Sequence, residues 1–204
     1  MLNFPIVEIF QSLQGEGYNT GMPAIFIRFG GCNLRCPWCD TNFDNFQKLS
    51  LTAILTRVLT YSAKNIIITG GEPTLQKYLP ELVTRLKQLG YYVAIETNGL
   101  KSVYSEIDYI AVSPKYHYWR RYHDAPLIKA DEVRIVVEEA KDIAEFCLAM
   151  EQRIEAKRYY LSPCEQNGQM ALLPTLELLG KLNQGRQNNK WQLSIQTHKL
   201  ANIE

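Results

Sequence analysis

The sequence lacks long apolar runs, and neither sign of charge dominates it. Its longest apolar runs, such as Ile66–Ile68, fall far short of the roughly 18 to 20 residues that span a bilayer. The 22 Lys and Arg residues balance 21 Asp and Glu residues, so no net field attracts nucleic acid or an anionic membrane. Met1–Pro5 lacks the charged and apolar regions of a signal peptide. These absences predict a cytoplasmic protein with no membrane or nucleic-acid partner.

The amino-acid composition is close to the average for globular proteins. Of the 204 residues, 46% are hydrophobic and 21% are charged, which excludes an intrinsically disordered chain and a fibrous repeat. This length suits one domain with a substantial core and is short for two enzyme domains. We therefore predict a single domain spanning residues 1–204.

Apolar and β-branched runs recur along the chain, with amphipathic helical patterns between them. Most of the runs are nearly continuous, as expected of strands covered on both faces. Helical stripes cover 51–59, after a capping Ser50, and 75–89, ending at Gly90; later stripes cover 140–150 and 172–182. This alternation predicts a parallel α/β fold. The expected strands are 24–29, 66–69, 92–96, 109–112, 133–137, 159–161 and 193–196.

The stretch between Val112 and Val133 breaks the alternation. It contains Lys115 to His123, which hold four aromatic residues, three basic residues and two histidines without a helical stripe. We expect a loop or lid held by aromatic packing. A second polar stretch, 184–190, is expected to be a surface loop.

Unusual residues follow the ends of five expected strands. Ligands bind at the carboxyl ends of parallel strands, because loops there vary without disturbing the sheet. One face of the fold is therefore expected to carry the chemistry. The segments concerned are the cysteine cluster after Phe29, 70–73 after Ile68, 97–99 after Ile95, 113–115 after Val112, and 162–164 after Leu161.

Three of the five cysteines, Cys32, Cys36 and Cys39, lie within eight residues in a C-x3-C-x2-C pattern. Soft thiolates select iron–sulfur clusters, zinc or cuprous copper. A four-iron cluster held by three thiolates keeps one iron open, whereas structural zinc needs a fourth ligand from Cys164 or a histidine elsewhere. We favour the cluster over zinc and expect Cys147, on a helical apolar stripe, to be a buried structural thiol.

The cysteine pattern, with Trp38 directly before the third cysteine, resembles the radical S-adenosylmethionine (SAM) superfamily. The resemblance implies a [4Fe-4S] cluster whose open iron is chelated by SAM, and cleavage of SAM to a 5′-deoxyadenosyl radical by one electron. Gly70–Pro73 matches the superfamily's second element, in which backbone groups approach the methionine moiety.

Further segments narrow the resemblance to the 7-carboxy-7-deazaguanine synthase family of queuosine precursor biosynthesis. This family converts 6-carboxy-5,6,7,8-tetrahydropterin to 7-carboxy-7-deazaguanine with loss of ammonia, as a carbon–nitrogen lyase that uses Mg²⁺. The resemblance also implies a homodimer, a flavodoxin-like or other reductant, and an incomplete (β/α)6-type radical SAM partial barrel with about six core strands. The matching segments are 8–17, 39–41, 96–99, 113–115 and 196–199.

The resemblance implies roles for individual residues but no catalytic protein side chain, because SAM and the cluster supply the radical. Arg28 also has a chemical argument: a pterin carboxylate suits a bidentate cation, and Arg28 lies on the strand leading to the cysteines. Ser162 departs from the glutamine that precedes the proline in relatives. The implied cluster ligands are Cys32, Cys36 and Cys39, and Thr41 is the Mg²⁺ ligand. The implied SAM contacts are Trp38, Cys39, Asp40, Gly71, Ser113, Pro114, Lys115, Ser162, Pro163, Cys164 and Glu165. The implied substrate contacts are Leu13, Gln14, Gly15, Arg28 and Thr69.

Two alternative functions remain at this point. A radical SAM activase that installs a glycyl radical on a partner protein would share the cluster loop and the small size. A zinc-stabilised RNA-binding module would use the aromatic and basic segment 115–123, although the balanced charge argues against it.

Overall fold

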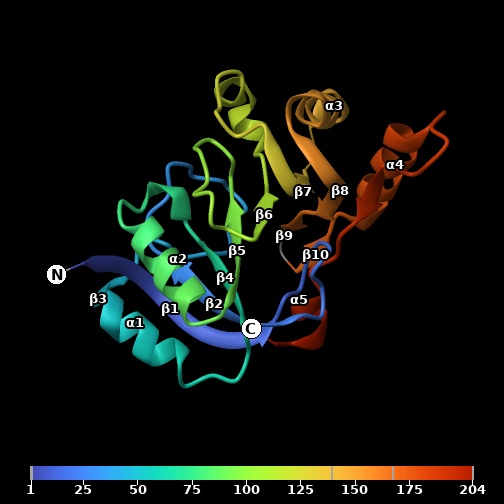
Figure 1. Cartoon of the computed structure of the whole chain (residues 1–204). Coiled ribbons are helices and arrows are strands. Elements are labelled where there is room, and N and C mark those ends of the chain that lie inside the picture. Colours follow the sequence, from blue (N-terminus) through green and yellow to red (C-terminus); the bar gives the residue numbers. More distant parts are fainter. Residues whose placement is uncertain (1, 139, 167, 204) are drawn as a thin grey trace.

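The computed structural model describes residues 2–138, 140–166 and 168–203. Its centre is a nine-stranded sheet in the order β11-β8-β7-β6-β5-β4-β2-β1-β3 (Figure 1). A separate two-stranded ribbon pairs β9 with β10. The sheet strands are β1 (Asn3–Leu13), β2 (Pro23–Phe29), β3 (Gln47–Ser50), β4 (Asn65–Gly70), β5 (Tyr92–Thr97), β6 (Tyr109–Val112), β7 (Lys129–Val137), β8 (Glu155–Pro163) and β11 (Trp191–Leu193); the ribbon strands are β9 (Glu165–Gln166) and β10 (Gln169–Met170).

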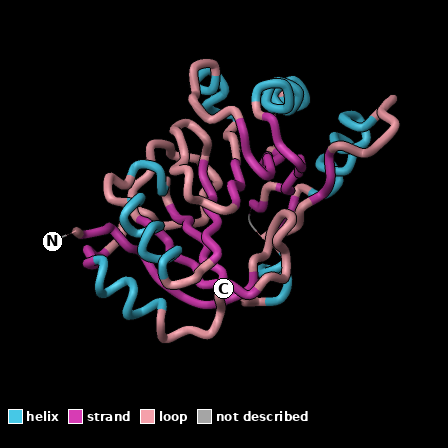
Figure 2. Tube along the Cα trace, viewed as in Figure 1, coloured by secondary structure: helices cyan, strands magenta, loops and turns pink. Residues whose placement is uncertain are grey.

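Helices lie around the periphery of the strands (Figure 2). Helix α1 packs on β1 and β3 and α2 packs on β5, while α3 and α4 cover β7, β8 and β11. Within the described residues, no helix is both long and apolar enough to cross a membrane. The α-helices are α1 (Leu51–Val58), α2 (Leu79–Gln88), α3 (Ile143–Arg153), α4 (Leu172–Asn183) and α5 (Thr197–Ala201), and the 3₁₀ helices are η1 (Pro73–Leu75) and η2 (Tyr116–Tyr122).

The expected α/β partial barrel is confirmed. From β2 through β4, β5, β6, β7 and β8 to β11, every neighbouring pair is parallel, so the six core strands of the expected partial barrel are followed by the short β11. β1 and β3 extend one edge in antiparallel fashion. The sheet curves but stays open between its end strands, β3 and β11. Its concave side is therefore available for a pocket.

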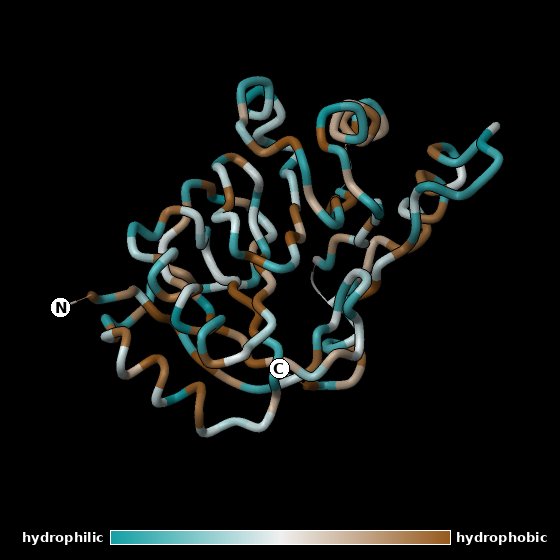
Figure 3. The backbone as a smooth tube through the Cα atoms, viewed as in Figure 1, coloured by the Kyte–Doolittle hydropathy of each residue, from teal (hydrophilic) through white to brown (hydrophobic). Residues whose placement is uncertain are grey.

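Alternation along each strand separates the two faces of the sheet. On β2, Ile25 and Ile27 join the core under the helices, whereas Phe26 and Arg28 face inward. Ala94 and Ala111 belong to the same inner cluster as Phe26, and their small side chains take up little space there. Hydrophilic residues are frequent on the loops at the molecule's outer tips (Figure 3). The same strands thus supply an apolar outer core and a partly polar inner face.

Several boundaries differ from the sequence expectations. The predicted helix 75–89 is divided into η1 and α2, and β1 and β3 were not anticipated because antiparallel edge strands leave a weak mixed pattern. β7 begins at Lys129, four residues before the expected strand 133–137. β11 ends at Leu193, where the expected strand 193–196 was to begin. The cap is confirmed: Ser50 Oγ accepts a hydrogen bond from the Ala53 amide at 3.2 Å.

The predicted apolar stripe of α4 is partly wrong. Leu172 and Leu176 are 39% and 43% exposed, whereas Thr175, Leu178 and Leu182 are buried. Leucines occur on several sides of this helix, so periodicity alone does not fix the buried face, which is decided by packing on β8 and β11. The polar stretch 184–190 lies on the surface, as expected.

Candidate active site

A cavity of about 580 Å³ lies against the concave face of the sheet and the loops that follow its strands. It is the meeting point of the segments that the sequence marked at strand ends. Every predicted site residue except Pro114 lines this cavity; Pro114 is buried outside it. The expectation that one face collects the unusual residues agrees with this arrangement, while their individual roles stay predictions.

The cysteine loop is fixed by short-range backbone contacts. The Leu34 amide donates to Cys32 Sγ at 3.4 Å, and the Cys39 amide donates to the Cys36 carbonyl at 3.2 Å. Cys32 and Cys36 are partly buried, while Cys39 is exposed, and none of the three is in a disulfide. The loop therefore brings three thiols to the edge of one cavity.

The donor set suits an iron–sulfur cluster. Burial raises the pKa of Cys36 to about 11, opposed by Lys115 and reinforced by the nearby thiols of Cys39 and Cys32. In the present side-chain rotamers, no group of three or more His, Cys, Asp or Glu residues within the described ranges is arranged to hold a metal ion. Convergence on one centre requires rotation of the thiols, with loss of their protons. Cys164 and His198, two of the residues considered as a fourth zinc ligand, line the same cavity as the three thiols.

The glycine turn after β4 lies directly against the cysteine loop. A Cβ on Gly71 would come within 1.9 Å of the Gly31 carbonyl oxygen, so this contact requires glycine. The buried Glu72 accepts hydrogen bonds from Thr97 Oγ1 and the Asn98 amide, both at 2.7 Å. Glu72 therefore ties the loop after β5 to the turn after β4.

Arg28 and Thr41, predicted to hold the substrate carboxylate and Mg²⁺, are neighbours. Arg28 Nη1 donates to Thr41 Oγ1 at 3.3 Å, and Arg28 Nε lies 2.6 Å from Glu8 Oε1. The Arg28 guanidinium also lies 5.6 Å from the centroid of the Phe10 ring. Glu8 and Phe10 line the same cavity and were not singled out from the sequence.

A buried polar cluster forms the floor of the cavity. Glu96 Oε1 accepts from Gln14 Nε2 at 3.0 Å, and Glu96 Oε2 accepts from Thr69 Oγ1 at 2.9 Å. Two predicted substrate contacts, Gln14 and Thr69, are thus joined by a carboxylate that sequence reasoning did not assign. The sequence does contain a sign of this role, because alternation along β5 places Glu96 on the inward face of the sheet.

Arg134 on β7 organises this cluster. Its guanidinium lies 2.6 Å from Glu96, 2.8 Å from Glu16 and 3.3 Å from Glu132. Although burial acts to raise it, Arg134 and the surrounding hydrogen bonds lower the pKa of Glu96 to about 2. For Glu16, burial outweighs the attraction of Arg134 and raises the pKa. Two cavity-lining carboxyls beside one guanidinium therefore have pKa values shifted in opposite directions.

Lys115 links the loop after β6 to the cysteine loop. Its Nζ donates to Ser113 Oγ at 2.6 Å and lies 5.0 Å from the centroid of the Trp38 ring. Burial lowers the pKa of Lys115. The end of β8 completes this side: within the described residues, the buried Ser162 Oγ has no hydrogen-bond partner and its residue lines the cavity. Such a buried polar group is suited to a bound ligand.

The C-terminal segment closes the cavity from the open side of the sheet. The Thr197 amide donates to the Gly15 carbonyl at 3.0 Å. Lys199 Nζ lies 2.9 Å from Glu165 and 3.3 Å from Asp40, joining the start of β9 to the cysteine loop. Sequence reasoning noted the segment 196–199 but did not place it in the site.

Comparisons with known proteins show which chains this one is similar to. Residues 26–122 match the model of the radical SAM superfamily. A 7-carboxy-7-deazaguanine synthase of Haemophilus influenzae is 56% identical over 202 residues, covering 99% of this chain and 95% of the relative. The synthase of Neisseria meningitidis is 52% identical, covering 98% and 94%. The crystal structure of QueE from Escherichia coli has a TM-score of 0.70 at 28% identity, covering 95% of this chain and 94% of that one.

Proposed function

Because the chain belongs to the 7-carboxy-7-deazaguanine synthase family of radical SAM enzymes, we propose that its cavity contracts the ring of 6-carboxy-5,6,7,8-tetrahydropterin with loss of ammonia. The observation that carries this substrate is the contact between Arg28 and Thr41 beside the cysteine loop. It puts a carboxylate-binding cation and a neutral oxygen in one cavity. The identity and coverage of the synthase relatives favour this function over a glycyl-radical activase or a zinc-stabilised RNA-binding module.

Membership of the radical SAM superfamily implies a [4Fe-4S] cluster and SAM. We propose that Cys32, Cys36 and Cys39 hold the cluster and leave one iron for SAM. Together these groups supply a 5′-deoxyadenosyl radical when bound. The chain's own share is to orient SAM and substrate and to exclude water from the cavity. The proposed SAM contacts are Trp38, Asp40, Gly71, Ser113, Pro114, Lys115 and the segment 162–165, with Pro114 acting through the backbone conformation it imposes.

The substrate would lie between the cysteine loop and the polar floor. Arg28 binds its carboxylate from one side, while Leu13–Gly15 and Thr69 contact the flat heterocycle. Glu8 already occupies the Nε side of the guanidinium, so the Nη side beside Thr41 is the one that meets the substrate. A Mg²⁺ ion held by Thr41 would then contact the same carboxylate, since this ion usually combines one or two protein oxygens with water and ligand oxygens.

The wider assignments rest on the family membership and on the length and composition of the chain. We propose a flavodoxin-like or other protein reductant, because the cluster needs one electron for each SAM that it cleaves. We also propose a homodimer, a single domain over residues 1–204 and a cytoplasmic location.

Replacement of Arg28 tests the substrate assignment. Arg28→Ala should leave cluster assembly and SAM binding intact but raise the pterin concentration required for turnover. A charge-assisted bidentate contact contributes about 1.5–3 kcal/mol, or roughly tenfold to more than a hundredfold in affinity. Arg28→Lys should recover part of this loss, because it keeps the charge without the planar fork. Pterin-dependent formation of the deazaguanine product is the measurement.

Arg57→Ala is the matched control, because Arg57 is exposed on α1 and its guanidinium packs over Tyr61. It should behave as the unmodified protein. Unchanged pterin kinetics in Arg28→Ala would remove Arg28 from the substrate site. Parallel loss of SAM binding and pterin binding would instead give Arg28 a structural role.

A further inference from the structure

The segment 115–123, expected to be a loop or lid held by aromatic packing, contains η2, a 3₁₀ helix packed on the outer core. The ring centroids of Tyr116 and Trp119 lie 5.7 Å and 5.5 Å from the ring centroid of Phe146 on α3. The buried Tyr122 hydroxyl donates to the Asn98 carbonyl at 2.9 Å and accepts from the Lys115 amide at 2.9 Å. These contacts fix η2 to α3 and to the loop after β5, so the position of η2 is set by the core of the protein.

Two side chains of η2 form hydrogen bonds with the cysteine loop between Cys32 and Cys36. The Arg35 amide donates to the Tyr118 hydroxyl at 2.9 Å. Arg121 Nη1 donates to the Asn33 carbonyl at 3.0 Å. Both bonds fasten the backbone of the loop, and both come from residues more than 80 positions later in the chain. The loop's conformation is therefore not set by its own sequence alone.

A third contact holds the part of the loop between the second and third cysteines. Trp38 Nε1 donates to Glu138 Oε2 at 3.3 Å, and the same oxygen lies 2.6 Å from His117 Nε2. The Glu138 side chain is 8% exposed, so this carboxylate sits between the indole and the imidazole, largely out of solvent. His117, at the start of η2, thus helps to fix Trp38 through Glu138.

We propose that Tyr118, Arg121 and the His117–Glu138 pair form a clasp that holds the cysteine loop in its cluster-binding conformation. A cluster held by only three thiolates has no fourth protein ligand to restrain the loop, so restraint from outside the loop lowers the conformational entropy lost when the cluster binds. The clasp also covers one side of the loop. Its members are positioning residues, because they contact the loop backbone and Trp38 rather than the cluster.

The clasp predicts local changes in two variants. Tyr118→Phe removes the acceptor for the Arg35 amide, and Arg121→Ala removes the donor to the Asn33 carbonyl. Loss of one such bond should increase amide hydrogen exchange of residues 32–39 in the full-length apoprotein roughly threefold to tenfold. The combined variant should show a larger increase. After anaerobic reconstitution, the same variants should lose the cluster's visible absorbance faster in air.

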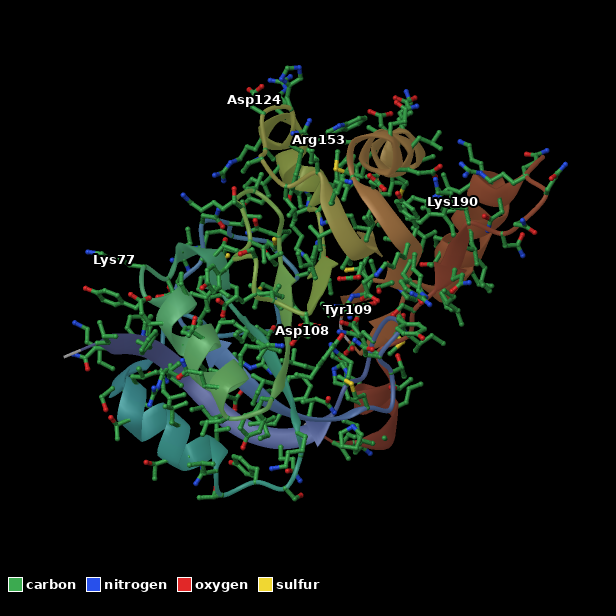
Figure 4. The ribbon with its side chains drawn as sticks, viewed as in Figure 1. Lys77, Asp108, Tyr109, Asp124, Arg153 and Lys190 are labelled. Carbon is green, nitrogen blue, oxygen red and sulfur yellow. The ribbon has the colours of Figure 1, made fainter. Side chains whose placement is uncertain are left out.

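The chain offers a control on the same segment. Asp124 lies at the outer tip beyond η2 (Figure 4), where it pairs with His123. The side chains of His123 and Asp124 are 88% and 92% exposed. Asp124→Asn should leave both measurements unchanged. Arg121→Lys keeps a donor and should restore part of the protection lost in Arg121→Ala.

The proposal would be overturned if the combined Tyr118→Phe, Arg121→Ala variant kept two properties of the unmodified protein. These are the rate of amide hydrogen exchange at residues 32–39 and the rate at which the cluster's absorbance is lost in air. Faster exchange throughout the sheet would also overturn it, because that result would mean general destabilisation instead of a local hold on the loop. Neither measurement uses the pterin. Failure of the clasp therefore remains distinguishable from failure of the substrate assignment.

Discussion

Replacing Arg134 with methionine tests the electrostatic organisation of the cavity floor. The guanidinium is 6% exposed and lies within 3.3 Å of three carboxylates, those of Glu16, Glu96 and Glu132. Methionine fills a similar length but leaves these carboxylates in a buried site without the guanidinium that contacts all three. Arg134→Met is therefore expected to destabilise the folded protein.

The magnitude follows from two independent arguments. Removing one partner of a buried ion pair typically costs about 3–5 kcal/mol, because the remaining charge stays desolvated. The pKa of Glu96 falls from 4.5 to about 2, and at about 1.4 kcal/mol for each pKa unit this gives roughly 3–4 kcal/mol. For a chain of this size, a loss of about 3–5 kcal/mol lowers the melting temperature by roughly 6–20 °C.

The effect should depend on pH in a defined direction. The pKa of Glu96 is depressed in the folded state, so its contribution is present above the unfolded pKa near 4.5 and is lost as pH falls toward 2. The raised pKa of Glu16 acts oppositely, contributing stability at low pH that is lost as pH rises through its folded value. In Arg134→Met, burial is left to raise the pKa of both groups. The stability difference between the two proteins should therefore be largest near pH 7 and shrink toward pH 4.

Urea unfolding of the apoprotein, followed by circular dichroism from pH 7 to pH 4 under reducing conditions, measures this difference. Adding Glu96→Gln to Arg134→Met should recover part of the lost stability, because it removes one unpaired charge. A stability difference that stays constant across this pH range would refute the reasoning. A double variant less stable than Arg134→Met would do the same.

Two further predictions concern the metal groups. Cys36→Ala should lose the [4Fe-4S] cluster and SAM cleavage, because it removes one of three proposed thiolate ligands, whereas Cys147→Ala, at a buried site on α3, should keep both. Iron and sulfide analysis with 5′-deoxyadenosine detection decides this, and a full cluster in Cys36→Ala would disprove the ligand assignment. Thr41→Ala should raise the Mg²⁺ concentration needed for stimulation of turnover without altering cluster absorbance. An unchanged Mg²⁺ titration would exclude Thr41 from the ion site.

Local sequence determined the features that depend on neighbouring residues. The spacing of Cys32, Cys36 and Cys39 places three thiols in one short loop, whatever the rest of the chain does. The apolar runs predicted most of the parallel strands, and loops at their carboxyl ends share one edge of a parallel sheet by geometry. The family resemblance then named residues that line the cavity, including Arg28 and Thr41.

Only the tertiary structure decided which distant residues meet. Arg134 and Glu16 are 118 residues apart, and their contact depends on strand register and on the loop after β1. The clasp on the cysteine loop has no local signal, because the bonds from Tyr118, Arg121 and Glu138 reach residues at least 83 positions away in the chain. Alternation along β5 and β7 indicates which residues share a face. The curvature of the assembled sheet then turns Glu96 and Arg134 into the cavity, and that curvature arises from all the strands together.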